Sequence, residues 1–250
     1  MSVKPIPYGI SNYNTLIRDG YAYVDKTMYI RSLEQAGVYN LFLRPRRFGK
    51  SLFASMLGYY YDIAEKDNFD FLFSNMDIGR NPTKRKNTYY VLKFNFSGIR
   101  TGSPEIMLES FSSKIHNALR TFRRAYQLDI ALEMNSPEIQ LSTFFAEFQE
   151  NCDGKIYVII DEYDHFANLA TPRVGGRPPP LLTSREDLKH DYLAPCSLNS
   201  ISEDTTIWDS AYSRHGEVCK WYEVLKEASE TIVERIFITG VSPITLDNLT

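Results

Sequence analysis

The residues that point most directly to chemistry lie at 44–51, where the sequence RPRRFGKS ends in Gly49, Lys50 and Ser51. In the pattern GxxxxGK[ST], backbone N–H groups surround the phosphates of a nucleotide, the lysine reaches the β- and γ-phosphate oxygens, and the hydroxyl coordinates Mg²⁺. Lys50 and Ser51 match the last two roles. The sequence therefore predicts a phosphate-binding loop of the Walker A type for a nucleoside triphosphate.

This loop departs from the pattern at its first glycine. Arg44 stands at that position and Pro45 follows it, so the loop cannot be assumed to close as a glycine-rich loop does. Arg46 and Arg47 supply cationic donors that can bind phosphate oxygens instead. The alternative is a basic turn in front of a surface helix, and the loop by itself does not decide between the two.

Two elements are expected to hold the loop in place. The apolar run that begins at Leu41 predicts a strand leading into it, and apolar residues at helical spacing predict a helix over Ser51–Ile63. The N-terminus and dipole of this helix would then point at the phosphates. The nucleotide-binding residues expected here are Arg46, Arg47, Phe48, Gly49, Lys50, Ser51 and Leu52.

A second motif, KIYVIIDEYDH, occupies residues 155–165. Ile156–Ile160 is an unbroken apolar run, typical of a strand that is buried on both faces of a parallel sheet. Asp161 and Glu162 follow at its C-terminal tip, where α/β sheets bind their ligands. We expect Asp161 to hold Mg²⁺, directly or through water, and Glu162 to orient and deprotonate the attacking water, as in a Walker B motif. A strand that ends in an ordinary acidic turn is the alternative.

A further buried strand is predicted over Arg235–Thr239, RIFIT, and small polar residues follow it. One class of NTPase inserts an additional strand between the strand of the phosphate loop and the acidic strand. In that class the tip of the inserted strand carries a residue that senses the γ-phosphate. Thr239 or Ser242 fits this role, and an ordinary exit from a strand explains them equally well.

The rest of the chain predicts the remaining elements by periodicity. Asp25 or Thr27 is expected to cap a helix that ends near Gly37, and Ser142 is expected to cap another. Extended segments are expected at 6–8 and 21–24, a strand at 89–96, and helices at 104–126, 141–148 and 217–231. We expect residues 1–37 to form a leader that packs on an ATPase core at 38–250, with a Pro/Gly-rich insertion at about 170–213.

Composition bounds the class of protein. The chain has 250 residues, 43% of them hydrophobic and 24% charged, which is ordinary for a globular α/β protein. A net charge of −3 gives no overall attraction to nucleic acid, so the basic runs Lys84–Lys86 and 120–124 are expected to be solvated surfaces or local contacts.

The cysteines and the hydropathy pattern suggest a compartment. Cys152, Cys196 and Cys219 are far apart and lack the spacing of a zinc site, which favours a reducing environment without disulfides. The sequence has neither a membrane-span-length apolar run nor a signal-peptide core. We therefore expect an intracellular, cytoplasmic protein.

Four segments together resemble the AAA-ATPase-like family. They are YVDKT at 23–27, LFLRPRRFGKS at 41–51, YVIIDEYDHFAN at 157–168 and RIFITGVSPITLDNLT at 235–250. The RPRRFGK[ST] form is specific to that family, so the missing glycine is a family trait. The resemblance implies a three-layer α/β P-loop NTPase fold with a mainly parallel sheet of the additional-strand, AAA-like class. It also implies ATP and Mg²⁺ as ligands, and hydrolysis of ATP.

Members of this family often carry a C-terminal PD-(D/E)xK-type nuclease domain, whose residues are absent here. The sequence ends where the family's ATPase domain would continue, so a truncated core is expected. Hydrolysis would then depend on an arginine from a partner subunit, another copy of the chain or domain closure. Two alternatives stay open, a nucleotide-gated binding or scaffold module and a degenerate remnant of the family without turnover.

Overall fold

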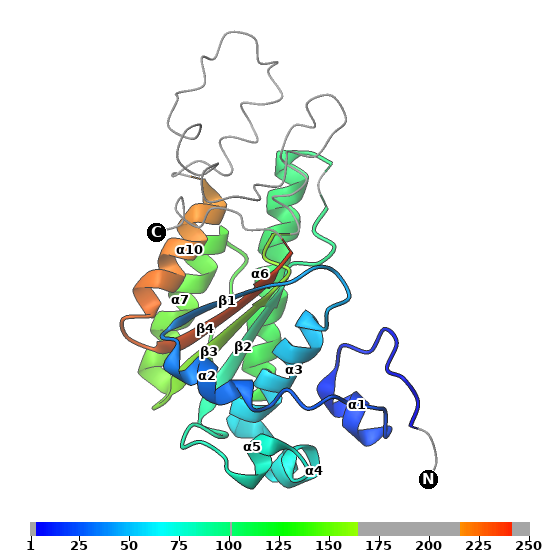
Figure 1. Ribbon diagram of the computed structural model, residues 1–250. Helices are drawn as coiled ribbons and strands as arrows, with labels where there is room; N and C mark the ends of the chain where they lie inside the picture. The colour runs from blue at the N-terminus through cyan, green and yellow to red at the C-terminus, as the bar shows by residue number, and fades with distance from the viewer. Residues whose placement is uncertain (1–3, 101, 165–215, 242–250) are drawn as a thin grey trace, which may run out of the picture.

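A computed structural model describes residues 4–100, 102–164 and 216–241, and a parallel β-sheet lies at its centre (Figure 1). The described strands are β1 (Tyr39–Leu43), β2 (Tyr89–Asn95), β3 (Lys155–Asp161) and β4 (Val233–Gly240). Their order is β1-β4-β3-β2, and each neighbouring pair is parallel. β4 thus lies between the strand of the phosphate loop and the acidic strand, which confirms the predicted additional-strand class of α/β fold.

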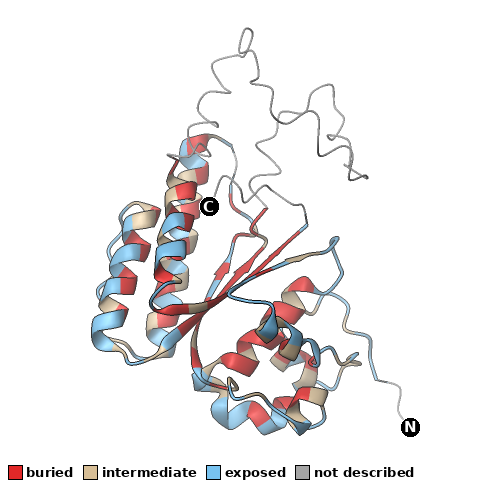
Figure 2. Cartoon of the chain, turned by 60° about the vertical axis from the view of Figure 1, so that its left-hand side comes forward, coloured by how far each residue is buried: buried red, intermediate tan, exposed pale blue. Residues whose placement is uncertain are grey.

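Helices cover both faces of the sheet (Figure 2). One face packs against α6 (Pro104–Ala125), α7 (Pro137–Asn151) and α10 (Glu217–Ala228). The other packs against α3 (Lys50–Tyr61) and several short elements. These are α1 (Tyr13–Arg18), α2 (Tyr29–Gln35), the 3-10 helix η1 (Ile63–Asn68), α4 (Phe69–Phe73) and α5 (Asp77–Arg80). The result is the three-layer arrangement expected from the sequence.

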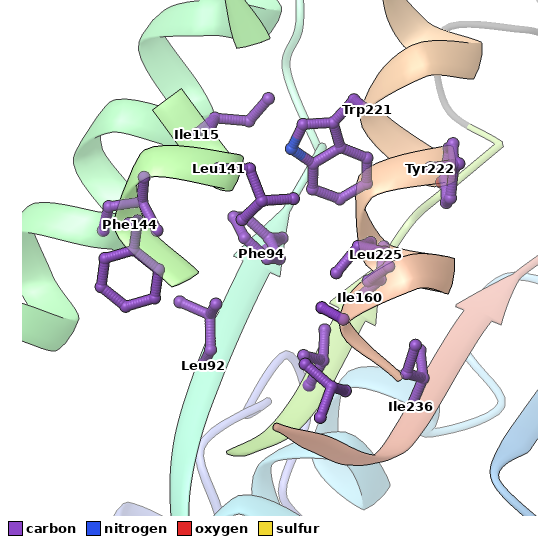
Figure 3. Packing of buried hydrophobic residues seen from close by; sticks show 14 of the residues in the cluster. Leu92, Phe94, Ile115, Leu141, Phe144, Ile160, Trp221, Tyr222, Leu225 and Ile236 are labelled. Carbon is purple, nitrogen blue, oxygen red and sulfur yellow. The ribbon is translucent and has the colours of Figure 1, made fainter. Parts of the chain in front are cut away.

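The core between the sheet and α6, α7 and α10 is organised around Trp221 (Figure 3). Its indole ring is fully buried and meets the rings of Phe94 and Phe111 edge to face, with centroids 5.0 and 5.6 Å away. These contacts join α10, β2 and α6. Burial of these large aromatic side chains stabilises the packing of α10 on the sheet.

The core on the opposite face is rich in tyrosine. Tyr61 stacks on Tyr157 of β3 with ring centroids 4.4 Å apart, and its hydroxyl donates a hydrogen bond to Glu34 of α2. Burial raises the pKa of Tyr61 far above its usual value, so the hydroxyl stays protonated and acts as the donor. Tyr13 of α1 likewise donates to the carbonyl oxygen of Leu72 at 3.1 Å. Each buried phenol thus brings a distant segment onto the face that carries α3.

The predicted caps for the helix after residue 27 were wrong. Met28 is the N-cap of α2 and makes no side-chain capping bond. Asp25 instead accepts hydrogen bonds from the N–H groups of Thr27 at 2.8 Å and Asp77 at 2.7 Å, and the Thr27 hydroxyl accepts from Ile78 N–H. The DKT segment therefore caps α5, which is remote in sequence, because tertiary contact outcompetes the nearer helix.

Other local predictions also differ from the structure. Segments 6–8 and 21–24 form no strand. α7 begins at Pro137, after the N-cap Ser136, whereas Ser142 lies inside the helix and donates to the carbonyl oxygen of Ile139. Proline at the first helical position sets the start of α7 more strongly than a hydroxyl one turn later. The insertion at 170–213 lies outside the described residues, and the division at residue 37 stays a prediction.

Replacing Asp25 with alanine is expected to destabilise the fold by about 1–3 kcal/mol, because it leaves donors of α5 without a partner. Although burial by itself would raise the pKa of Asp25, hydrogen bonds from Thr27 and Asp77 hold it below its ordinary value. The stabilisation is therefore present above about pH 4 and is lost as the pH falls through the folded-state pKa. Urea unfolding of wild type and Asp25→Ala measures this difference at two pH values, one above about pH 4 and one below the folded-state pKa of Asp25. Asp67→Ala, at an exposed position, is the control. An equal difference at both pH values would contradict it.

No helix in the described part of the chain is long and apolar enough to cross a membrane.

Candidate functional site

The predicted phosphate loop connects the end of β1 at Leu43 to the start of α3 at Lys50. Two of its residues have left-handed backbone conformations, Arg47 with φ 68° and Gly49 with φ 77°. Glycine adopts such a φ without steric cost, whereas an arginine adopts it only where the surrounding chain holds it there. The loop therefore makes its turns at 47 and 49, without the glycine that the usual pattern has at its start.

Lys50 closes this loop from the inside. Its side chain is buried, and Nζ donates hydrogen bonds to the carbonyl oxygens of Arg44 at 2.9 Å and Pro45 at 3.2 Å. The ammonium group at the end of the loop thus binds the backbone at its beginning. This arrangement explains physically how a loop with Arg44 and Pro45 in place of glycine keeps a closed shape.

The other loop residues present donors to solvent. Arg46, Arg47 and Gly49 are exposed, and Phe48 is 61% exposed. Ser51 and Leu52 in the first turn of α3 are partly buried. The arginines are thus accessible to an anion, and α3 directs its N-terminal N–H groups into the same loop.

The acidic strand and the inserted strand meet at their tips. The buried hydroxyl of Thr239 on β4 donates a hydrogen bond to Oδ1 of Asp161 at the end of β3. Thr239 is also the register partner of Phe42 in β1, and the N–H of Arg44 donates to the carbonyl oxygen of Gly240 at 3.2 Å. The structure therefore brings together Thr239, Asp161 and the first residue of the phosphate loop at the C-terminal edge of the sheet. Ser242, the other predicted sensor, lies outside the described residues.

Glu162 follows Asp161 in an unusual conformation. It is partly buried and has φ 57°, in the left-handed region that glutamate rarely adopts. The next residue, Tyr163, donates its N–H to the carbonyl oxygen of Thr239 at 3.1 Å, so pairing with β4 continues beyond Glu162. A left-handed residue of this kind costs of order 1 kcal/mol or more, and such residues cluster at functional sites.

Two residues that our sequence interpretation did not assign also shape this edge. Asp164 is 2% exposed, and its Oδ2 accepts a hydrogen bond from the N–H of Val241 at 2.8 Å. Gly240 lies so close to Tyr163 that an added Cβ would stand 2.3 Å from a ring carbon. In the sequence, these residues are the last acid of DEYD and the glycine that ends the inserted strand, but neither position shows what the residue contacts.

Substituting Gly240 with alanine should therefore destabilise the protein by about 1–3 kcal/mol, because the Tyr163 ring must move to admit a methyl group. Since Gly240 adjoins Thr239, the same change should weaken nucleotide binding. Thermal unfolding and calorimetric titration with Mg²⁺-ATP measure the two effects. Gly102→Ala is the matched control, because its Cβ would meet only a side-chain carbon of Ile106 at 3.6 Å. Equal melting temperatures for the two variants would show that the Tyr163 contact carries no steric constraint.

The residues expected to hold Mg²⁺ are Ser51 and Asp161. No cluster of three or more His, Cys, Asp or Glu side chains suited to a metal ion exists within residues 4–100, 102–164 and 216–241. Magnesium in nucleotide sites usually takes one or two protein oxygens, with the remaining ligands from phosphates and water. The hydroxyl of Ser51 at the start of α3 and the carboxylate of Asp161 at the end of β3 are oxygen donors of the kind that this ion takes.

Comparisons with known proteins show the family of the chain. A family model described as "Predicted AAA-ATPase" matches residues 7–174, which include the phosphate loop and the acidic pair. A curated protein of Azotobacter chroococcum mcd 1, "Uncharacterized protein in vnfD 5'region", is 30% identical over 181 residues. The match covers 70% of this chain and 32% of that protein, so the chain spans about a third of the relative's length. No solved structure matches significantly. Since the family model covers most of a chain with this strand order, the protein belongs to the AAA-ATPase-like family.

Proposed function

We propose that this chain is a Mg²⁺-dependent ATP-binding domain that hydrolyses ATP. The observation that carries the proposal is the meeting of three motifs at one edge of the sheet. The Thr239 hydroxyl donates to Asp161, and the carbonyl oxygen of the adjoining Gly240 accepts from the N–H of Arg44, where the loop that Lys50 closes begins. Ligands of α/β sheets bind at this edge. The membership of the AAA-ATPase-like family supports a nucleotide as the ligand.

Each residue then has a distinct task. Lys50 exchanges its two carbonyl partners for β- and γ-phosphate oxygens, which are stronger acceptors for an ammonium group. The backbone of Phe48, Gly49 and Leu52 and the side chains of Arg46 and Arg47 bind the remaining phosphate oxygens. Ser51 and Asp161 would hold Mg²⁺, which supplies charge neutralisation at the phosphates.

Hydrolysis requires a base and a sensor. Glu162 accepts a proton from the attacking water, and its left-handed backbone sets its position beyond the end of β3. Thr239 would sense the γ-phosphate by turning its hydroxyl from Asp161 to a phosphate oxygen, since the hydroxyl has one proton to donate. Turnover by this chain alone should be slow, because an arginine from another subunit adds a factor of about 10³–10⁵ in related NTPases.

Calorimetric titration with Mg²⁺-ATP tests the proposal. Wild type should bind in the micromolar range, and Lys50→Ala should show no measurable binding, because it removes the ammonium group that would contact the β- and γ-phosphates. Lys66→Ala is the matched control, since Lys66 is an exposed lysine of η1 at the other end of α3. Absence of binding by folded wild-type protein, or equal binding by Lys50→Ala, would overturn the proposal.

A further inference from the structure

A hollow of about 730 Å³ lies at the C-terminal end of α6, and it is lined mostly by polar and basic side chains. Arg120, Arg123 and Arg124 line it, and Asp129 is the acidic residue among its lining residues. Arg123 donates to the carbonyl oxygen of Ile130 at 3.2 Å and so fixes the turn that follows the helix. The hollow therefore has an excess of positive charge.

Two of these arginines remain available. Arg120 and Arg124 are exposed, and neither forms an ion pair within the described residues. They stand four positions apart on α6, so their Cβ atoms lie about 5–6 Å apart on the same face. Arginines at the end of a helix do offset its dipole. Offsetting the dipole does not require a hollow beside the arginines. It also leaves the exposed guanidinium groups of Arg120 and Arg124 without a bound anion.

The fold also brings a second basic run to the edge of the sheet at which α6 ends. Asp62 accepts two hydrogen bonds here. Its carboxylate accepts one from the hydroxyl of Tyr126, the residue directly after α6, at 2.8 Å, and its backbone carbonyl oxygen accepts one from Nδ2 of Asn87 at 2.7 Å. Asn87, which directly follows Lys84–Lys86, and Tyr126, which directly follows α6, are therefore held by the same residue although they are far apart in sequence. Lys84 is exposed, whereas Arg85 pairs with Glu234.

This edge is opposite the candidate nucleotide site. α6 begins beyond the C-terminal tip of β2 and runs back along the sheet to the lower end of the molecule in Figure 1. Its 22 residues span about 33 Å at the rise of an α-helix. An anion bound at the hollow would therefore occupy a location separate from the phosphate loop.

We propose that the hollow binds the phosphate backbone of nucleic acid, with Arg120 and Arg124 as the phosphate-contacting residues and Lys84 extending the contact along the strand. Arginine is suited to this role because its planar fork of donors matches a phosphate group in two places. Two basic runs along one edge fit an extended polyanion better than a single small phosphate. The contact is independent of base sequence and does not depend on ATP binding.

Fluorescence anisotropy with a labelled DNA duplex of about 20 base pairs, without nucleotide, between about 50 and 200 mM salt, tests this surface. Arg120→Gln/Arg124→Gln should weaken binding at least about tenfold, the loss expected of two charge-assisted contacts. It should also make the slope of log K against log salt less steep by about 1.8. Lys4→Gln/Arg100→Gln removes the same charge from exposed positions elsewhere and should leave both quantities near wild type.

A second variant tests the surface by gain of binding. Thr121 is exposed and lines the hollow, so Thr121→Lys should tighten DNA binding and steepen the salt slope by about 0.9. Circular dichroism melting of each variant establishes that it is folded. No DNA binding by folded wild type at low salt, or equal affinity and slope in Arg120→Gln/Arg124→Gln, would overturn the proposal.

A last experiment separates nucleic acid from small phosphates. Inorganic triphosphate is titrated into Lys50→Ala, which weakens the phosphate loop as a competing site. One outcome would assign the hollow to a free polyphosphate and show that the nucleic-acid proposal is wrong. In that outcome triphosphate binds to Lys50→Ala, its affinity is lost when Arg120→Gln/Arg124→Gln is added, and the duplex does not bind. Binding of the duplex with negligible affinity for triphosphate is the result that we expect.

Discussion

Glu162→Gln should leave Mg²⁺-ATP binding intact and lower the single-turnover rate of phosphate release by about 10²–10⁴, the usual contribution of a general base. Glutamine keeps the size and hydrogen-bonding reach of the side chain but cannot accept a proton from water. The left-handed backbone of residue 162 should be kept in this variant, because the bond from Tyr163 N–H to Thr239 holds the chain directly after it. A fall in rate without a fall in affinity would therefore come from the lost base.

The exposed residue Glu227, on α10, supplies the matched control. Glu227→Gln should release phosphate at the wild-type rate. If wild type releases phosphate no faster than Glu162→Gln while both bind ATP, the hydrolysis proposal fails. The domain would then be a nucleotide-gated binding module, in which ATP acts as a switching ligand.

Trp221→Ala is expected to lower the free energy of unfolding by about 3–5 kcal/mol, the range for removing a large buried aromatic side chain. For a chain of this size, such a loss lowers the melting temperature by roughly 6–20 °C. The cavity would open between α10, β2 and α6, where the indole meets the rings of Phe94 and Phe111. Thermal unfolding followed by circular dichroism gives the shift.

Two further variants make this result specific. Trp221→Phe should lose less stability, since it keeps an aromatic ring and removes an indole N–H that has no hydrogen-bond partner among the described residues. Ile139→Ala, at a position 46% exposed on α7, should change the free energy of unfolding by no more than about 0.5 kcal/mol. A loss below about 1 kcal/mol in Trp221→Ala would show that α10 is held by other contacts.

The sheet was the most predictable part of the fold, and β3 shows why. Its residues alternate between the two cores, with Ile156, Val158 and Ile160 on one face and Tyr157 and Ile159 on the other. A strand covered on both faces must be apolar at every position, so burial leaves a signal that can be read without any knowledge of its neighbours. The position of β4 between β1 and β3 was expected from the resemblance to the additional-strand class, and the structure confirmed it.

The face that carries α3 could not be predicted in the same way. Its short helices are held by contacts between distant segments, such as the bond between Asp25 and Asp77. The pattern DKT before an apolar run is a sound local signal for a cap, yet its partners lie on a helix that follows much later in the chain. Local propensity cannot reveal which distant N–H groups will compete for a carboxylate.

The candidate site was predictable in its residue types but not in its geometry. The spacing GKS identified Lys50 as a candidate phosphate ligand, whereas its bonds to the carbonyl oxygens of Arg44 and Pro45 follow from backbone torsions that spacing does not encode. The left-handed conformation of Glu162 is equally invisible in the sequence. Which of these residues bind ATP and Mg²⁺ stays a prediction for the measurements described above.

The hydrogen bond between Thr239 and Asp161 makes these two residues one energetic unit. Removing the hydroxyl would leave a buried carboxylate without this donor, and neutralising the carboxylate would change what the hydroxyl can bind. The effects of Thr239→Val and Asp161→Asn on ATP affinity should therefore be non-additive in a double-mutant cycle. A defect in either single variant reports on the pair, so γ-phosphate sensing and metal binding cannot be divided between the two side chains.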